Sequence, residues 1–123
     1  KVTYSFLPHN EAFSANSVIK PAYIANYKPI IVNGEYHMPS LVSVDAPNVI
    51  IETIKPCEEN ERAFILRLYE AEGTYAKTNL AIHFPATKVE ETNMLEEVKS
   101  EFAFDNGVEL TFRPFEIKTI KMS

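Results

Sequence analysis

Hydrophobic and polar residues alternate along most of this chain, in short runs that end at Pro, Gly, Asn or Asp. Alternation with a period of two, rich in β-branched and aromatic residues, predicts strands with one buried face. The predicted strands lie at residues 1–7, 41–45, 49–55, 62–70, 75–84, 87–93, 102–104, 108–112 and 115–122. We therefore expect a mainly all-β fold, an antiparallel β-sandwich of about eight or nine short strands.

One segment, between Asn10 and Tyr27, has the period of a helix instead. Its apolar residues recur at the three- and four-residue spacing of one helix face: Ala15, Val18, Ile19, Ala22, Tyr23 and Tyr27. Pro21 lies inside this pattern, where it removes a helix hydrogen bond and crowds the carbonyl four residues back. We expect one short N-terminal helix that is kinked or begins late, with Asn10, Ser14 or Asn16 as its N-cap.

Two further predictions concern the second half of the chain. Residues 87–93 are polar for a strand, which is typical of a sheet edge. The sequence Asp105-Asn106-Gly107 separates two alternating segments, and Asn and Gly tolerate the positive φ of a tight turn. We therefore predict a hairpin that joins residues 102–104 to residues 108–112.

Length and composition indicate one globular unit. The chain has 123 residues, of which 46% are hydrophobic and 24% charged. A chain of this size buries about two-thirds of the surface of its unfolded form, so we expect residues 1–123 to form a single β-sandwich domain. Residue 1 is Lys rather than Met and already lies in a strand-like pattern, so we expect this domain to be a fragment of a longer chain.

The charge balance bears on partners and localisation. The formal net charge of -5 argues against nucleic acid and against an anionic membrane surface as partners. No apolar run approaches the roughly 18 to 20 residues of a membrane span, and no signal-peptide pattern is present. Cys57 is the single cysteine, so no intrachain disulfide can form. A cytoplasmic localisation is the expectation.

The search for reactive groups assigns no catalytic residue. No glycine-rich phosphate loop and no G-x-S-x-G motif occurs. Cys57 lies beside Glu58 and Glu59, which disfavour a thiolate, so its expected role is structural. His9 and His37, like His83, have no second ligand at helix or strand spacing. We expect them to make local hydrogen bonds and assign no metal ligand, although a metal site assembled across the fold stays open.

Three acidic pairs suggest a glycosidase, because such enzymes use two opposed carboxyl groups. These pairs are Glu58-Glu59, Glu90-Glu91 and Glu96-Glu97. Neighbouring strand residues point to opposite faces, so a solvated acidic surface is the favoured interpretation. Tyr27, Tyr36 and Tyr75 lie near turns and are the first candidates for carbohydrate contact, while the substrate-binding residues stay unknown.

Four motifs carry a resemblance to a known family. Residues 40–56 (SLVSVDAPNVIIETIKP), 64–71 (FILRLYEA), 93–97 (NMLEE) and 112–119 (FRPFEIKT) resemble, in this order, the C-terminal region of glycoside hydrolase family 38 α-mannosidases. Residues 4–9 (YSFLPH) are similar to the start of the same region. Pro21 and Cys57 depart from the pattern of the family. Within the second motif, Arg67 is free to pair with a carboxylate.

The resemblance implies the terminal β-sandwich of a retaining, zinc-dependent α-mannosidase that acts on mannose-containing glycans. It implies that the zinc and the aspartate nucleophile belong to a separate catalytic domain, because no residue here matches those motifs. The domain alone is expected to be inactive and to pack against the remaining domains of the same chain. Two alternatives stay open: a carbohydrate-binding module, and a free-standing adhesion or interaction module of the immunoglobulin type.

Overall fold

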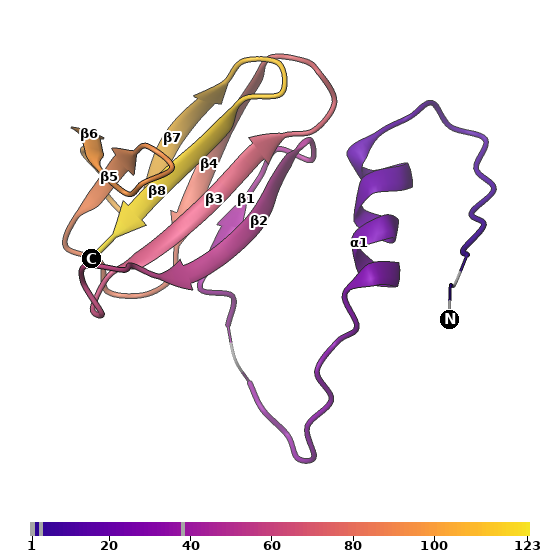
Figure 1. Ribbon diagram of the computed structural model, residues 1–123, viewed down its shortest axis with the longest axis horizontal. Helices are drawn as coiled ribbons and strands as arrows, with labels where there is room; N and C mark the ends of the chain where they lie inside the picture. The colour runs from indigo at the N-terminus through magenta and orange to yellow at the C-terminus, as the bar shows by residue number, and fades with distance from the viewer. Residues whose placement is uncertain (1, 3, 38) are drawn as a thin grey trace.

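Two antiparallel sheets packed face to face dominate the computed structural model, which describes residues 2, 4–37 and 39–123 (Figure 1). Within those residues the strands are β1 (Val42–Val44), β2 (Val49–Pro56), β3 (Phe64–Glu70), β4 (Ala76–Ile82), β5 (Val89–Thr92), β6 (Val98–Glu101), β7 (Gly107–Phe112) and β8 (Ile117–Met122). One sheet has the order β1-β4-β7 and the other the order β2-β3-β8-β5-β6. The expected β-sandwich is confirmed.

The core lies between the two sheets, where alternate residues of the long strands meet. Fully buried side chains come from both sheets: Leu66, Leu68, Ile120 and Met122 from the larger one, and Leu80, Leu110 and Phe112 from the smaller one. Cross-strand partners such as Leu66 and Ile120 point to the same face, so each pair adds to the same apolar layer. The alternation of hydrophobic and polar residues in the sequence therefore corresponds to the alternation of buried and exposed residues along these strands.

The N-terminal helix begins late, as expected. Ser14 is its N-cap and exchanges hydrogen bonds with Ser17 in a capping box. A π-helical turn, η1 (Ala15–Ile19), leads directly into α1 (Lys20–Asn26), and Pro21 lies just after the change from π-helical to α-helical spacing. The helix lies beside β2, outside the two sheets (Figure 1). It is too short to cross a membrane, and the described residues contain no other helix long and apolar enough to do so.

The predicted strand at residues 1–7 is wrong for the residues that the structure describes. Val2 and residues 4–7 form no strand, while Lys1 and Thr3 lie outside the described residues. Tyr4 and Phe6 are 91% and 90% exposed. Alternation makes a segment compatible with a sheet, but a strand forms only where a neighbouring strand supplies hydrogen bonds.

The prediction of an edge strand at residues 87–93 is also wrong. β5 lies between β8 and β6, and Val89 and Thr92 are buried. The edge is β6, whose four residues are all exposed. Because β6 is short and fully exposed, it gives no hydrophobic signal in the sequence, and the sequence therefore shows no neighbour for β5 on that side.

The predicted hairpin around Asn106 is the third difference. Asn106 has a positive φ of 59°, as the turn motif suggested. The predicted strand at residues 102–104, however, is not formed. The strand that precedes the turn, β6, pairs with β5, whereas β7 pairs with β4 in the other sheet. The turn therefore carries the chain from one sheet to the other, a connection that local turn chemistry does not distinguish from a hairpin.

Candidate functional site

The Glu70 carboxylate ties three segments together at one end of the sandwich. It is fully buried and accepts hydrogen bonds from the N–H groups of Glu72 (2.9 Å), Gly73 (2.8 Å), Thr74 (3.1 Å) and Phe115 (3.0 Å), from Asn48 Nδ2 (2.9 Å) and from the Thr74 hydroxyl (3.3 Å). Burial alone raises the pKa of this carboxyl, but these donors outweigh burial and lower the pKa to about 2. Glu70 is thus an ionised structural group with no free lone pair directed at solvent.

The turn that Glu70 holds presents Phe115 in an uncommon backbone conformation. Phe115 has a φ of 57°, a region that a bulky side chain rarely adopts. Its ring lies against Gly73, where an added Cβ would stand 2.7 Å from the ring. Glu116 completes the turn by accepting hydrogen bonds from the N–H (2.7 Å) and the guanidinium (3.1 Å) of Arg113. The motifs at residues 64–71 and 112–119 therefore meet in space and form one end of the sandwich, which we call the tip.

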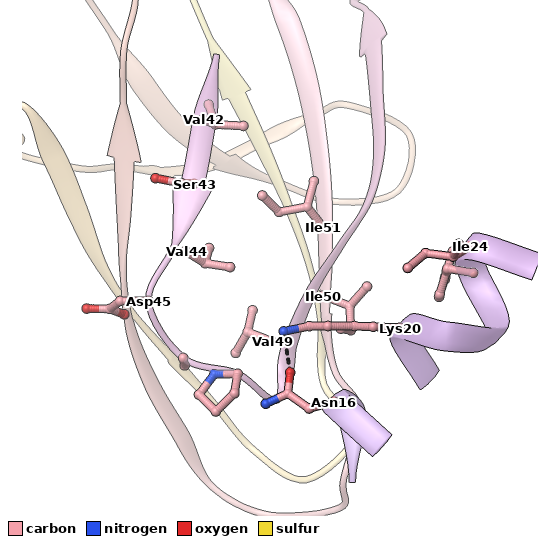
Figure 2. Close-up of a pocket in the computed structure, with 13 residues that line it drawn as sticks. Asn16, Lys20, Ile24, Val42, Ser43, Val44, Asp45, Val49, Ile50 and Ile51 are labelled. Atoms are coloured by element: carbon pink, nitrogen blue, oxygen red, sulfur yellow. Dashed lines mark hydrogen bonds between the residues drawn. The ribbon is translucent and has the colours of Figure 1, made fainter. Parts of the chain in front are cut away.

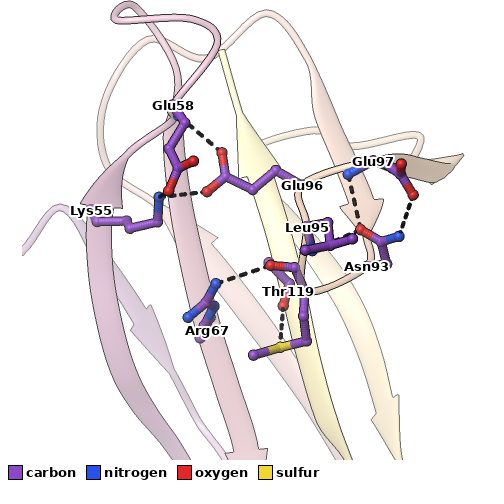
Figure 3. Close-up of polar contacts among 9 residues, drawn as sticks. Lys55, Glu58, Arg67, Asn93, Leu95, Glu96, Glu97 and Thr119 are labelled. Carbon is purple, nitrogen blue, oxygen red and sulfur yellow. Dashed lines mark hydrogen bonds and ion pairs between the residues drawn. The ribbon is translucent and has the colours of Figure 1, made fainter.

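Another motif of the family resemblance, residues 93–97, forms a loop that crosses the outer face of the larger sheet (Figure 3). Asn93 Oδ1 accepts hydrogen bonds from the N–H groups of Leu95 (2.9 Å) and Glu97 (3.0 Å). Asn93 Nδ2 donates to the Glu97 carboxylate at 2.6 Å. This side chain closes the loop on itself and fixes Glu96 at a φ of 68°. We call residues 93–97 the strap.

Glu96 carries the strap to the far edge of the sheet. Its Oε1 lies 2.5 Å from Lys55 Nζ on β2, and its Oε2 accepts the N–H of Glu58 at 3.0 Å (Figure 3). The hydrogen bonds from Lys55 and from the Glu58 amide lower the pKa of Glu96 to about 2, and the same pairing raises the pKa of Lys55. Only 8% of the Glu96 side chain is exposed.

Arg67 lies under the strap and does not meet the carboxylate that the sequence suggested. Its Nη2 donates to the carbonyl of Met94 at 3.2 Å, so the expected carboxylate partner is wrong (Figure 3). Its Nε is buried and has no partner among the residues that the structure describes. Glu52, Tyr69 and Ile117 help to line the adjoining cavity of about 180 Å³.

A wide groove lies between the helix and strands β1 and β2 (Figure 2). Its volume is about 630 Å³, and its floor is apolar: Val42, Val44, Val49, Ile50 and Ile51. Lys20 donates to Asn16 Oδ1 at 2.7 Å, and Asp45 accepts from the Thr78 hydroxyl (2.7 Å) and the Asn79 N–H (2.8 Å). The Thr78 and Asn79 hydrogen bonds lower the pKa of Asp45. The polar groups of the groove are therefore engaged with neighbours and form no acid–base pair.

The acidic pairs separate into two kinds. Glu58, Glu59 and Glu97 are exposed or half-exposed, as a solvated surface requires. The side chains of Glu96 and Glu90, in contrast, are largely buried. Glu90 is 6% exposed, and its Oε1 lies 2.5 Å from Lys88 Nζ. The interpretation as solvated surface is wrong for these two carboxylates. Lys55, on a strand distant in the sequence, pairs with Glu96, and Lys88, only two residues away, pairs with Glu90.

The remaining sequence candidates do not converge on one place. Cys57 is buried against Ala63 and Ile65, which agrees with a structural role. His9 Nδ1 pairs with the Glu11 carbonyl, and His83 Nε2 with the Ser43 hydroxyl, while His37 is exposed. Tyr27, Tyr36 and Tyr75 are exposed as expected.

The residues that the structure describes form no metal centre. Within residues 2, 4–37 and 39–123, no three His, Cys, Asp or Glu side chains lie close enough together to hold a metal ion. The carboxylates of Glu70 and Glu96, which are held ionised, already bind backbone amides and Lys55. The side chains present do not fit a zinc site.

Comparison with known proteins gives the chain a family. Residues 48–120 match the model of the glycosyl hydrolases family 38 C-terminal beta sandwich domain. The chain is 32% identical to the mouse protein Alpha-mannosidase 2C1 and 31% identical to the human protein of the same name. Each alignment covers 96% of the chain and 12% of the relative, so the chain spans about an eighth of the length of these relatives. The chain belongs to the C-terminal β-sandwich domains of glycoside hydrolase family 38.

Proposed function

We propose that this domain is a non-catalytic module of a longer α-mannosidase polypeptide, in which it packs against and supports the domain that removes terminal α-mannose residues. The observation that carries the proposal is the family match of the sandwich, together with relatives of which this chain covers only 12%. The contacts of the two ionised carboxylates support it, because Glu70 binds the Phe115 amide and Glu96 binds Lys55, so that both hold loops in place.

The chemistry of the reaction then belongs to other residues of the longer polypeptide. A retaining mechanism and zinc dependence are part of this proposal for the whole enzyme. None of its steps is assigned to a side chain of this domain, because the side chains described here do not fit a zinc site. The partners proposed for this domain are the remaining domains of the same chain.

Two measurements test the supporting role. Removal of residues 39–123 from the full polypeptide should shorten the half-life of α-mannosidase activity at elevated temperature, measured with an aryl α-mannoside. Unchanged activity and heat resistance after this deletion would show that the domain supports nothing. Hydrolysis of the same substrate by the purified 123-residue chain, free of other mannosidases, would show that the domain is catalytic.

A carbohydrate-binding module is the second candidate, favoured by the exposure of Tyr27, Tyr36 and Tyr75. Exposed aromatic rings can stack on sugar faces, but in the part of the chain that the structure describes Tyr27 lines a pocket that neither Tyr36 nor Tyr75 reaches. Calorimetric titration with mannobiose and longer mannans is expected to give no binding heat. A saturable signal lost in Tyr75→Ala would favour this second candidate.

A further inference from the structure

The exposed apolar residues of this chain are concentrated at its N-terminal side. We call residues 4–37 the N-terminal arm. Its large exposed apolar side chains are Tyr4, Phe6, Leu7, Phe13, Ile24, Tyr27, Ile30, Ile31, Val32 and Tyr36. Ile30 and Ile31 are 91% and 89% exposed. A run of exposed apolar side chains this long marks a surface that meets a partner.

The composition of the arm is that of an interface rather than of a linker. The arm contains only four charged residues, Glu11, Lys20, Lys28 and Glu35, whereas the whole chain has 12 Lys and Arg and 17 Asp and Glu. Aromatic enrichment with depletion of charge distinguishes the cores of protein interfaces from ordinary surface. Flexible linkers have the opposite composition, rich in Gly, Ser and charge.

The arm is fixed to the sandwich at one place, its helix. Ala15 is fully buried against Ile50 and Ala71, and its N–H donates to Glu72 Oε1 at 2.6 Å. The hydroxyls of Tyr23 and Tyr69 lie 3.3 Å apart. The rest of the arm extends away from the sheets on both sides of this anchor (Figure 1). The core between the sheets is already filled, so it offers the arm no second binding place.

The comparisons indicate what covers the arm. The family model of the sandwich begins at residue 48, so the arm lies outside the sandwich proper. The relatives nevertheless align with 96% of the chain, and hence with nearly all of the arm, within polypeptides about eight times longer. A partner on the same polypeptide is present at high effective concentration, which favours it over a separate molecule.

We propose that the N-terminal arm docks, through its apolar side chains on either side of the helix anchor, onto another domain of the same longer polypeptide. This inference rests on the proposed function and names the surface through which the support is given. The helix holds the arm on the sandwich, and Tyr4, Phe6, Ile30 and Ile31 enter apolar depressions of the neighbouring domain.

Hydrogen–deuterium exchange of the full polypeptide tests the docking. Amides of residues 4–13 and 28–37 should exchange at least about tenfold more slowly than in an unfolded peptide. The double variant Ile30→Asp/Ile31→Asp should abolish this protection at residues 28–37 while β3 stays protected. Leu95→Asp is the control: it places an acidic side chain at a 79% exposed apolar residue of the strap and should leave the arm protected.

Each other outcome overturns the proposal in a distinct way. Free exchange of both segments shows that nothing covers the arm. Protection that rises with protein concentration, together with a dimer in light scattering, assigns the arm to a second copy. Protection that appears only with mannobiose assigns it to glycan. If the arm exchanges freely but deletion of residues 39–123 still destabilises the enzyme, the proposed function stands and the docking proposal alone fails.

Discussion

Lys55 on β2 and Glu96 in the strap form an ion pair of 2.5 Å that spans the outer face of the larger sheet. The strap leaves β5, on the opposite side of β8 and β3 from Lys55. The pair therefore closes a bridge over the two central strands, and Glu58 adds its N–H to the same carboxylate. Within the strap, Asn93 makes local hydrogen bonds to Leu95 and Glu97. The contact of Glu96 with Lys55, 41 residues away, fixes the strap to the sheet.

Replacement of Lys55 by Met should lower the urea midpoint of unfolding. Met preserves much of the apolar stem but leaves the Glu96 carboxylate, 8% exposed, without its cation. Lys77→Met is the control, because the Lys77–Glu109 pair is about two-thirds exposed on both sides and such pairs contribute little. Equal midpoints for the two variants would contradict the bridging role of Glu96.

Acid should destabilise the domain through Glu70 and Glu96. Both have a pKa of about 2 in the folded state, against an ordinary value of 4.5. A carboxyl with a lowered folded-state pKa contributes stability above its unfolded pKa and loses that contribution as the pH falls toward the folded one. The free energy of unfolding should therefore be level near neutrality and fall between about pH 5 and pH 2.

Urea titrations at several pH values, repeated with Glu96→Gln, measure how the free energy of unfolding changes with pH. The variant should be less stable near neutrality and show a shallower loss toward acid, because one of the two shifted carboxyls has been removed. Parallel curves for the variant and the parent chain would show that Glu96 does not carry the acid sensitivity.

Glu70→Gln should be among the most destabilising single-atom changes in the domain. The amide places an NH₂ group where one carboxylate oxygen receives N–H donors, and it removes the negative charge that those donors stabilise. Losses for buried hydrogen bonds to a charged group predict a decrease of about 2–4 kcal/mol in the free energy of unfolding. Glu72→Gln, whose carboxylate accepts the Ala15 N–H, should cost less in the same urea titration. A smaller effect at residue 70 than at residue 72 would contradict this.

The strands with one buried face could be predicted from the sequence, and the polar sites could not. Alternation placed β3 and β4 because each buries one face against the opposite sheet. It failed at residues 4–7, where the same pattern has no neighbouring strand, and at β6, where every residue is exposed. Strand pairing depends on partners that are distant in the chain, and local pattern contains no information about them.

The same limit explains the carboxylates. The sequence predicts Glu96 as a solvated surface acid because its partner Lys55 lies 41 residues away. It assigns Glu70 no role, and the Phe115 amide that donates to Glu70 lies 45 residues away. The resemblance to the family supplied an indirect signal, since Glu70, Glu96 and Glu116 all fall within its motifs. Only the fold shows that Glu70 and Glu116 shape one tip while Glu96 fastens the strap.

Gly73→Ala should destabilise the tip that Glu70 organises. Gly73 has a φ of 73°, and an added Cβ would lie 2.7 Å from the ring of Phe115. Backbone strain and this clash together predict a loss of about 1–3 kcal/mol. Because part of the cost is the clash, the double variant Gly73→Ala/Phe115→Ala should lose less than the sum of the single variants. Urea denaturation of the four proteins of this cycle measures the coupling, and strict additivity would show that Phe115 does not restrict residue 73.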